Sequence, residues 1–301
     1  MSEARYSIPE HGQIVDVQTY PVKSLPGASR TDGVRITENG LENDRIFTMA
    51  GTVVGENGTA PRLTLREHPE LTQITTGYTN EGVTLTAEGM DTLVLPCGVD
   101  GGDVVTVKSW GGAVAGLHVA AEADEWLGDF LKRNDVQILA VPDSNRRTLA
   151  EAEKDSRATE YTGRATDGYP LHVVSLASLR RLNEVRAQSG LAAIAIEHFR
   201  ANIVIDGLDL PPFAEDELSA MKFEDGADAV DIIAIRACER CVTVEADPAT
   251  GRKLGNVLKS LGTLQPERTT SAKLVFGVWA APSLLSVGGI IKAGQLLKPL
   301  S

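Results

Sequence analysis

Residues 237–251 read ACERCVTVEADPATG and hold two of the three cysteines in a chain of 301 residues. After Cys241, Val-Thr-Val places β-branched residues in sequence, which predicts a strand over residues 241–246. Asp247-Pro248 then starts a turn and Gly251 ends it. The segment therefore predicts that Cys241 lies at the edge of a strand that a turn follows.

Cys238 and Cys241 have the C-x-x-C spacing of a redox dithiol or of half a zinc site. A structural zinc site needs four ligands, whereas the five histidines here are scattered without paired spacing. A thioredoxin-like dithiol lies at the start of a helix, whereas a strand is predicted here. Two other readings stay open: two inert buried thiols, or one reactive thiolate beside an inert neighbour. Arg236 and Arg240 favour the thiolate, because nearby cations stabilise it.

Upstream, residues 13–110 read as short strands separated by turn segments such as ENGLEND (38–44) and GENGTAP (55–61). Their regular spacing is typical of a barrel or a tightly curled antiparallel sheet. Residues 120–133 place large apolar side chains on one face, which predicts an amphipathic helix. The first half of the chain is therefore expected to form a β-barrel-like domain followed by one helix.

Residues 142–170 are polar and almost free of large apolar residues, which is typical of a solvated linker. The functional alternative is a loop that becomes ordered over a ligand, with Arg146, Arg147 and Arg164 facing anions. Beyond it, Ser175 is a candidate helix cap, and strands are expected near residues 199–207, 229–237, 273–281 and 294–300. We therefore predict a mixed, β-rich α+β fold. The predicted domains cover residues 11–120 and 166–301, with a helix and linker region over 121–165.

Charge and cysteine content limit the partners and the compartment. The net charge of −12 argues against nucleic acid, since neutralising phosphate backbones requires a basic surface. Apolar runs stay below the roughly 18 residues that a membrane span needs, and the first residues, MSEARYSIPEHGQ, lack a signal-peptide core. Three cysteines cannot all pair, which favours reduced thiols. We expect a cytoplasmic protein without a membrane span.

Three further stretches carry candidate anion-binding residues. YPVKSLPG (20–27) presents Lys23 and Ser24 in a proline-bounded loop, and LENDRIF (41–47) places Arg45 beside strand-forming residues. FRANIVIDG (199–207) offers Arg200 and Asn202 just before an apolar strand. Taken one at a time, the first two are better explained as surface charges, and the third has the simpler explanation of a strand-entry turn.

Taken together, the motifs resemble a known family. YPVKSLPG, GLENDRIF (40–47), RLTLREHPEL (62–71), TDGYPLHVVSLASL (166–179), FRANIVIDG and RCVTVEADPATG (240–251) occur in this order. They resemble the molybdenum cofactor sulfurase C-terminal (MOSC) superfamily, in particular members with its N-terminal β-barrel domain. The resemblance runs from about residue 13 to the end of the chain and implies that the second domain is a MOSC β-barrel with flanking helices.

The resemblance also implies a mononuclear molybdenum centre on a pyranopterin dithiolene. Cys241 matches the family's metal-binding cysteine and would be the catalytic residue, which is chemically sensible because soft thiolates suit such metals. Cys238 would then be a neighbouring or packing residue. By position, the cofactor-binding residues implied are Lys23, Ser24, Arg45, Arg200, Asn202 and Arg240.

The activity implied is an oxidoreductase that reduces N-hydroxylated substrates such as amidoximes and hydroxylamines. Electrons would come from a separate flavin or iron–sulfur donor protein, since three cysteines cannot hold a four-cysteine cluster. The alternative is a carrier that holds sulfur as a persulfide on Cys241 or handles the cofactor without turnover. Pyridoxal phosphate binding is associated with the family, but we identify no pyridoxal-phosphate lysine module in the sequence.

Overall fold

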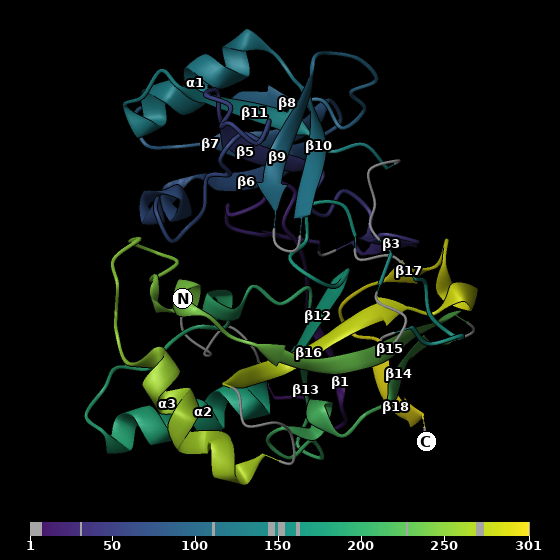
Figure 1. The fold of residues 1–301 in the computed structure, drawn as a ribbon. Coiled ribbons are helices and arrows are strands. Elements are labelled where there is room, and N and C mark those ends of the chain that lie inside the picture. The colour runs from purple at the N-terminus through teal and green to yellow at the C-terminus, as the bar shows by residue number, and fades with distance from the viewer. Residues whose placement is uncertain are drawn as a thin grey trace.

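The structure is a computed structural model that describes residues 8–30, 32–109, 112–143, 148–149, 154–160, 163–226, 228–268 and 274–300. Figure 1 shows two modules, one above the other, and the chain crosses between them more than once. Arg146 and Arg147, expected on a ligand-covering loop, lie outside the described residues. Arg164 is described, and its Nε donates to Asp143 Oδ1 over 2.6 Å.

The lower module is a closed ring of seven strands, which we call the barrel. Around the ring the order is β13, β12, β16, β15, β14, β18 and β1, and β1 closes the ring by pairing with β13. The short strand β2 pairs antiparallel with the C-terminal end of β1. The bounds are β1 (Gln13–Thr19), β2 (Ala28–Ser29), β12 (Leu171–Ser175), β13 (Ile203–Asp206), β14 (Ala220–Asp225), β15 (Asp228–Glu239), β16 (Val275–Pro282) and β18 (Leu296–Leu300).

Apolar side chains fill the barrel and cover one of its outer faces. Alternate residues of the strands, among them Ile14, Val173 and Ile232, form the interior cluster. A second cluster joins the barrel wall to α2 (Leu176–Gln188) and α3 (Val257–Leu264), which Figure 1 shows beside each other. The Ser175 side chain accepts a hydrogen bond from Ala177 N over 3.1 Å, so the predicted helix cap is confirmed.

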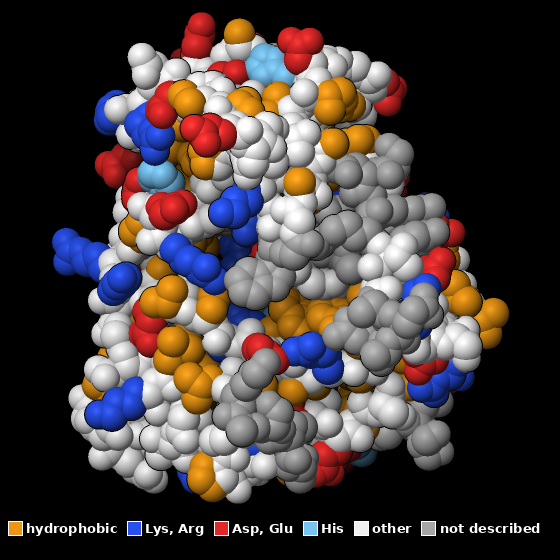
Figure 2. Space-filling model, in the orientation of Figure 1, with side chains coloured by type: hydrophobic (Ala, Val, Ile, Leu, Met, Phe, Trp, Pro, Cys, Tyr) orange, Lys and Arg blue, Asp and Glu red, His pale blue; other side chains and the backbone are white. Residues whose placement is uncertain are grey.

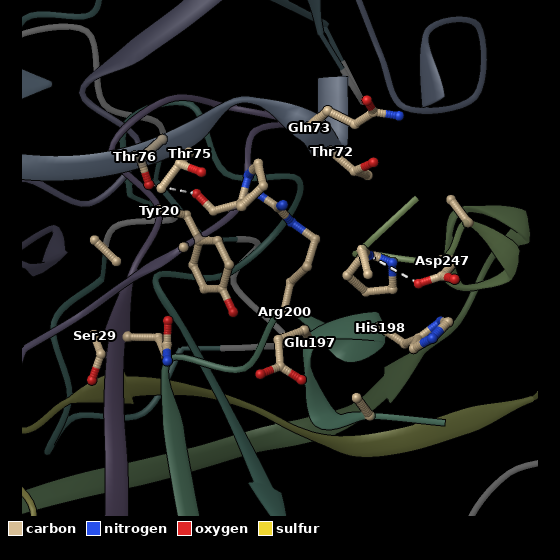
Figure 3. Close-up of a pocket in the computed structure, with 18 of the residues that line it drawn as sticks. Tyr20, Ser29, Thr72, Gln73, Thr75, Thr76, Glu197, His198, Arg200 and Asp247 are labelled. Atoms are coloured by element: carbon tan, nitrogen blue, oxygen red, sulfur yellow. Dashed lines mark hydrogen bonds between the residues drawn. The ribbon is translucent and has the colours of Figure 1, made fainter. Parts of the chain in front are cut away.

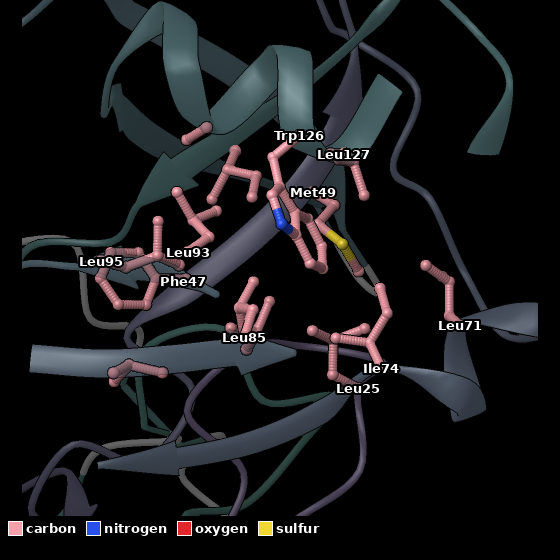
Figure 4. Packing of buried hydrophobic residues seen from close by; sticks show 14 of the residues in the cluster. Leu25, Phe47, Met49, Leu71, Ile74, Leu85, Leu93, Leu95, Trp126 and Leu127 are labelled. Carbon is pink, nitrogen blue, oxygen red and sulfur yellow. The ribbon is translucent and has the colours of Figure 1, made fainter. Parts of the chain in front are cut away.

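The upper module, which we call the N-terminal module, contains two antiparallel sheets and one helix. The first sheet has the order β5, β11, β10, β9, and the second has the order β6, β7, β8. Figure 4 shows the core between them, where Trp126 of the helix packs near Met49 and Leu127. The bounds are β5 (Phe47–Gly51), β6 (Thr75–Thr79), β7 (Gly82–Thr86), β8 (Leu93–Leu95), β9 (Val104–Ser109), β10 (Gly112–His118), α1 (Ala121–Leu131) and β11 (Val136–Ala140).

Short elements complete the fold. A small sheet joins β17 (Ile290–Ile291) to β3 (Val34–Thr37) and β4 (Gly40–Leu41). The 3-10 helices are η2 (Pro69–Gln73), η5 (Ile196–Phe199), η6 (Ala214–Asp216), η7 (Val242–Glu245), η8 (Gln265–Glu267) and η9 (Leu284–Ser286). No helix within the described ranges is long and apolar enough to cross a membrane.

The predicted β-rich α+β fold class is confirmed, but the expectation that residues 13–110 form one curled sheet is wrong for the first strand. Gln13 faces Asp206 and Leu296 in the barrel, so the first strand of the chain closes the second module. The predicted domain ranges remain a prediction. Side chains of α1 and β11 pack in the core of the N-terminal module.

The strand predicted over residues 241–246 is also wrong, because Val242–Glu245 form a 3-10 helix. Tertiary contacts determine this conformation. The Glu245 carboxylate accepts hydrogen bonds from the first amides of α3, Val257 N at 3.0 Å and Leu258 N at 2.9 Å. His198 Nδ1 lies 2.8 Å from Val244 O. These contacts hold the segment after Cys241 as a tight turn of helix.

The turn at residues 247–251 of the barrel module contacts the N-terminal module. Gln73 Nε2 donates to Thr250 O over 3.0 Å. Gly251 has a φ of +70°, and a Cβ placed there would lie 2.6 Å from the Pro69 carbonyl oxygen. A side chain therefore cannot be accommodated at Gly251 unless the modules shift.

Replacing Gly251 with alanine is expected to destabilise the protein more than the same change at Gly190. Both residues have nearly equal φ, +70° and +69°, so each alanine costs about 1–2 kcal/mol of backbone strain. Only Gly251 adds a collision, since nothing lies within 4 Å of the Gly190 position. Urea unfolding midpoints measure the difference, and equal midpoints for the two variants would show that the modules do not meet at this turn.

Candidate functional site

Cys241 is an exposed thiol whose surroundings favour the thiolate. It precedes the first residue of η7, with its Sγ 3.1 Å from Thr243 Oγ1. Desolvation would raise the pKa of the Cys241 thiol, but hydrogen bonds from Thr243 and from the Arg66 guanidinium outweigh it and lower the pKa. An exposed thiolate of this kind can bind a soft metal or attack an electrophile.

Cys238 differs from Cys241 in both burial and ionisation. It is fully buried on β15, and burial raises the pKa of its thiol even though Arg240 opposes the effect. Arg240 Nη1 donates to the Cys238 sulfur over 2.8 Å. The two cysteines are therefore not an equivalent pair, and the reading of one reactive thiolate beside an inert neighbour fits the structure.

A cluster of cations lies at the junction of the modules, close to Cys241. We call the five residues named at the end of this paragraph the cation cluster. The Asp167 carboxylate interacts electrostatically with each of them. Lys23 Nζ lies 2.8 Å from Asp167 Oδ1, and Arg62 Nη2 lies 3.5 Å from the same oxygen. These cations hold the pKa of the Asp167 carboxyl far below its usual range, although burial opposes them. Its members are Lys23, Arg45, Arg62, Arg66 and Arg200.

Lys23 is the member of the cluster whose charge is most easily changed. Burial lowers the pKa of the Lys23 ammonium to about 8, against the raising effect of Asp167. Its protonated form therefore predominates at neutral pH and is lost as the pH rises through about 8. Anion binding at the cluster is expected to weaken over the same range.

Asp167→Asn is expected to lower the pKa of Lys23 below about 8, because the change removes the carboxylate that raises it. The pH dependence of Lys23 acetylation, followed by peptide mass spectrometry, measures this shift. Asp143→Asn is a matched control, since Asp143 pairs with Arg164 outside the cluster. An unchanged or higher Lys23 pKa in Asp167→Asn would contradict the pairing.

Three of the predicted cofactor-binding residues have left-handed backbone. Ser24, Arg45 and Arg200 have φ values of 76°, 50° and 54°. For residues other than glycine this conformation costs on the order of 1–3 kcal/mol and is retained where the surroundings impose it, often at binding sites. Ser24 Oγ also donates to Leu63 O over 3.4 Å. The strained positions support the prediction that these residues form a binding site.

Tyr20 lies between two arginines of the cluster. The Arg45 and Arg200 guanidinium carbons lie 4.6 Å and 4.4 Å from its ring centroid. Arg200 Nη1 donates to Leu25 O over 2.5 Å, and burial lowers the pKa of Arg200 to about 10. Figure 3 shows Tyr20 and Arg200 side by side in the cleft. Stacking on the ring thus orients both guanidinium groups.

Asn202, predicted to bind the cofactor, makes all its hydrogen bonds within the protein. Its Nδ2 donates to Gln18 O at 3.1 Å and Asp44 Oδ1 at 3.2 Å. Its Oδ1 accepts from Arg45 Nη1 at 3.0 Å and from the His172 amide at 3.3 Å. Asn202 is 1% exposed and has no remaining hydrogen-bonding capacity, so its contribution here is to hold Arg45. Arg45 is also held by its ion pair with Asp44.

A cleft of about 1660 Å³ opens between the modules beside this site. Figure 3 shows Thr72 and Gln73 of the N-terminal module opposite His198 and Asp247 of the barrel module. Thr243, which contacts the Cys241 sulfur, also lines the cleft. In Figure 2, Lys and Arg side chains gather at the level where the modules meet. The volume exceeds that of an ordinary small-molecule pocket.

The site includes residues to which the sequence analysis gave no role: Arg62, Arg66, Asp167 and Thr243. Arg62 and Arg66 belong to the quoted motif RLTLREHPEL, and Asp167 belongs to TDGYP. These two motifs were the only indication in the sequence that Arg62, Arg66 and Asp167 could belong to the site. Only folding shows that Arg66 of the N-terminal module reaches Cys241 of the barrel module.

The donor set fits an anionic cofactor that brings its own metal ligands. Within the described residues, no group of three His, Cys, Asp or Glu side chains could hold a metal ion. The Nε atoms of Arg62 and Arg240 are buried without a hydrogen-bond partner, which is unusual for buried polar atoms. Five cations around Asp167 leave excess positive charge. An anionic group would meet these unused donors while Cys241 supplied one thiolate.

Comparison with known proteins gives the family. The model of the MOSC N-terminal beta barrel domain matches residues 11–134, and that of the MOSC domain matches residues 160–298. The chain is 28% identical to mitochondrial amidoxime reducing component 2 of Rattus norvegicus, over 82% of this chain and 70% of that protein. It is 27% identical to the Bos taurus protein of the same name, over 97% of this chain and 84% of that protein.

A third relative matches part of the chain. It is the molybdenum cofactor sulfurase of Aspergillus terreus (strain NIH 2624 / FGSC A1156), 29% identical over 43% of this chain and 16% of that protein. The two domain models, in sequence order, account for most of the chain. The chain therefore belongs to the MOSC-domain proteins and carries the N-terminal beta barrel domain of that family.

Proposed function

We propose that the protein is a molybdenum-cofactor-dependent oxidoreductase that reduces N-hydroxylated compounds. The observation that carries the proposal is the exposed Cys241, with its lowered thiol pKa, beside a cation cluster that spans both modules. The relatives named as amidoxime reducing components, matched over most of their length, support the same reaction class.

In this proposal the cation cluster binds the anionic end of the cofactor. Lys23 contributes a compact charge, while Arg45, Arg62 and Arg200 contribute planar donors suited to phosphate oxygens. The Ser24 hydroxyl, which donates a long hydrogen bond of 3.4 Å to Leu63 O, would turn its single proton to the cofactor. Cys241 binds the metal, and Thr243 and Arg66 keep its sulfur in the thiolate form. The chemistry that the bound cofactor supplies is two-electron oxygen-atom transfer.

The overall reaction consumes two electrons and two protons for each N–O bond broken. An amidoxime yields an amidine and one water, and the oxygen of the N-hydroxyl group leaves in that water. The cleft between the modules admits the substrate close to Thr243 and Cys241. A separate flavin or iron–sulfur protein supplies the electrons, since the three cysteines of this chain cannot form a four-cysteine cluster.

The assay that tests this function uses benzamidoxime, with a chemically reduced viologen as electron donor. Protein produced in a host that makes the molybdenum cofactor is expected to convert benzamidoxime to benzamidine, detected by chromatography. The consumption of two viologen electrons per benzamidine checks the balance. Protein that carries the cofactor and yet forms no benzamidine from any of several amidoximes or hydroxylamines would rule out the proposed reaction.

A carrier function is the second candidate, and the exposed thiolate of Cys241 is the observation that favours it. Such a thiolate can hold one sulfur atom as a persulfide, and part of the chain matches a molybdenum cofactor sulfurase. Intact-mass analysis would then find one extra sulfur, lost on reduction and absent from Cys241→Ala. A persulfide on protein that has no molybdenum would favour the carrier function over turnover.

A further inference from the structure

Arg240, the residue before the metal-binding cysteine, is held on two sides by groups that cannot move easily. Its Nη1 donates to the Cys238 sulfur over 2.8 Å, and its Nη2 donates to the Phe199 carbonyl oxygen over 3.1 Å. The guanidinium carbon lies 5.5 Å from the centroid of the Phe199 ring. Three contacts therefore fix the plane and the direction of the guanidinium group.

The groups that hold Arg240 belong to a barrel strand and to the apolar cluster packed against the outside of the barrel. Cys238 is fully buried on β15, one residue before that strand ends. Phe199 is 1% exposed and stacks on Phe276 with ring centroids 4.0 Å apart. Side chains in such a core keep one conformation, because close packing leaves no room for another. Cys238 and Phe199 are therefore fixed acceptors that hold the Arg240 guanidinium in one orientation.

The Arg240 guanidinium has five N–H donors, and the contacts to Cys238 and Phe199 use two of them. Its Nε is buried without a hydrogen-bond partner, and no carboxylate of the described residues forms an ion pair with this guanidinium. A buried N–H without an acceptor is costly, so the arrangement favours a ligand that brings an acceptor to this atom. Arg240 adjoins Cys241, and the carbonyl that its Nη2 contacts belongs to Phe199, directly before Arg200 of the cation cluster, so such an acceptor would lie beside the site of the proposed cofactor.

We propose that Cys238 is a positioning residue for Arg240: its sulfur is the acceptor that keeps the free Nε–H of Arg240 available to the cofactor beside Cys241. The proposal rests on the proposed function, since the ligand is the same cofactor. It gives Cys238 a role other than packing or redox chemistry. The C-x-x-C spacing then reflects one sulfur that accepts a hydrogen bond and one sulfur that binds metal.

The first test follows the orientation of Arg240 and does not need the cofactor. In cofactor-free protein, the ¹⁵N–¹H signal of Arg240 Nε is expected to be resolved from those of exposed arginines. Cys238→Val keeps an apolar side chain but removes the acceptor, and should shift that signal toward the position of a mobile arginine. An unshifted signal in Cys238→Val, in protein whose melting temperature shows that it is folded, would overturn the proposal.

The second test is a double-mutant cycle on cofactor release. Cys238→Val should release molybdenum and pterin about 10- to 100-fold faster than the wild type, the usual effect of losing a group that orients a ligand. In an Arg240→Met background the same change should have no further effect. Additive effects, or wild-type release from Cys238→Val, would assign Cys238 to packing alone. Failure of the proposed function looks different, because the wild type would then contain no molybdenum, or would carry the cofactor and form no benzamidine.

Discussion

Replacing Cys241 with alanine is expected to remove molybdenum from the protein and to abolish amidoxime reduction. The physical reason is that Cys241 is an exposed thiol in contact with both Thr243 and Arg66, and the lowered pKa of its thiol supplies the thiolate that a soft metal requires. Metal analysis of the purified variant by mass spectrometry, beside an amidoxime assay, measures the outcome.

Cys238→Ala and Cys97→Ala are the controls for this loss. Cys97 is exposed, but burial of its sulfur raises the pKa of its thiol, and it lies in the N-terminal module after β8. Its replacement should leave metal content and activity unchanged. Cys238→Ala should still bind the metal when the cofactor is in excess, although it should release it faster. Retention of stoichiometric molybdenum by Cys241→Ala would refute the assignment of the metal ligand.

The largest effect on stability is expected for Arg268→Ala. Arg268 and Asp216 form an ion pair with Nη2 and Oδ1 2.5 Å apart, and both side chains are 1% exposed. Arg268 also donates to Val275 O over 2.9 Å and lies over the Phe213 ring. Removing one partner leaves a buried carboxylate without its cation, which costs about 3–5 kcal/mol. Urea unfolding monitored by tryptophan fluorescence measures the loss.

Arg181→Ala is the matched control for the buried pair. Arg181 pairs with Glu267 over 2.6 Å, in the same part of the barrel module, but the two side chains are 28% and 39% exposed. Exposed ion pairs contribute less than about 1 kcal/mol. Similar losses in the two variants would mean that burial does not determine the cost. Asp216→Asn should be milder than Arg268→Ala, because the amide oxygen can still accept from Arg268, which keeps its contacts with Val275 O and the Phe213 ring.

The fold class followed from the sequence because periodicity and turn residues are local signals. Two features of the fold could not be predicted from the sequence, because they depend on contacts between residues far apart in the chain. The β-branched run after Cys241 has the pattern of a strand, yet Glu245 and His198 hold it as a 3-10 helix. The strand at residues 13–19 has an ordinary amphipathic pattern, and nothing local shows that Asp206 is its partner.

The site was partly accessible from the sequence for a similar reason. Cys241, Lys23, Arg45 and Arg200 are carried by motifs, and the structure brings them to the module junction. Asn202 was predicted as a ligand contact but saturates its hydrogen bonds on Arg45 and its neighbours. Arg66 could not be identified, because its contact with Cys241 joins two modules that are far apart in sequence.

Cofactor binding is tested most directly by the molybdenum and pterin content of the wild-type protein after expression in a host that makes the cofactor. We predict one molybdenum and one pterin per chain, retained through gel filtration and competed by neither phosphate nor moderate salt. Metal-free and pterin-free protein from such a host, with a persulfide on Cys241, would contradict the account.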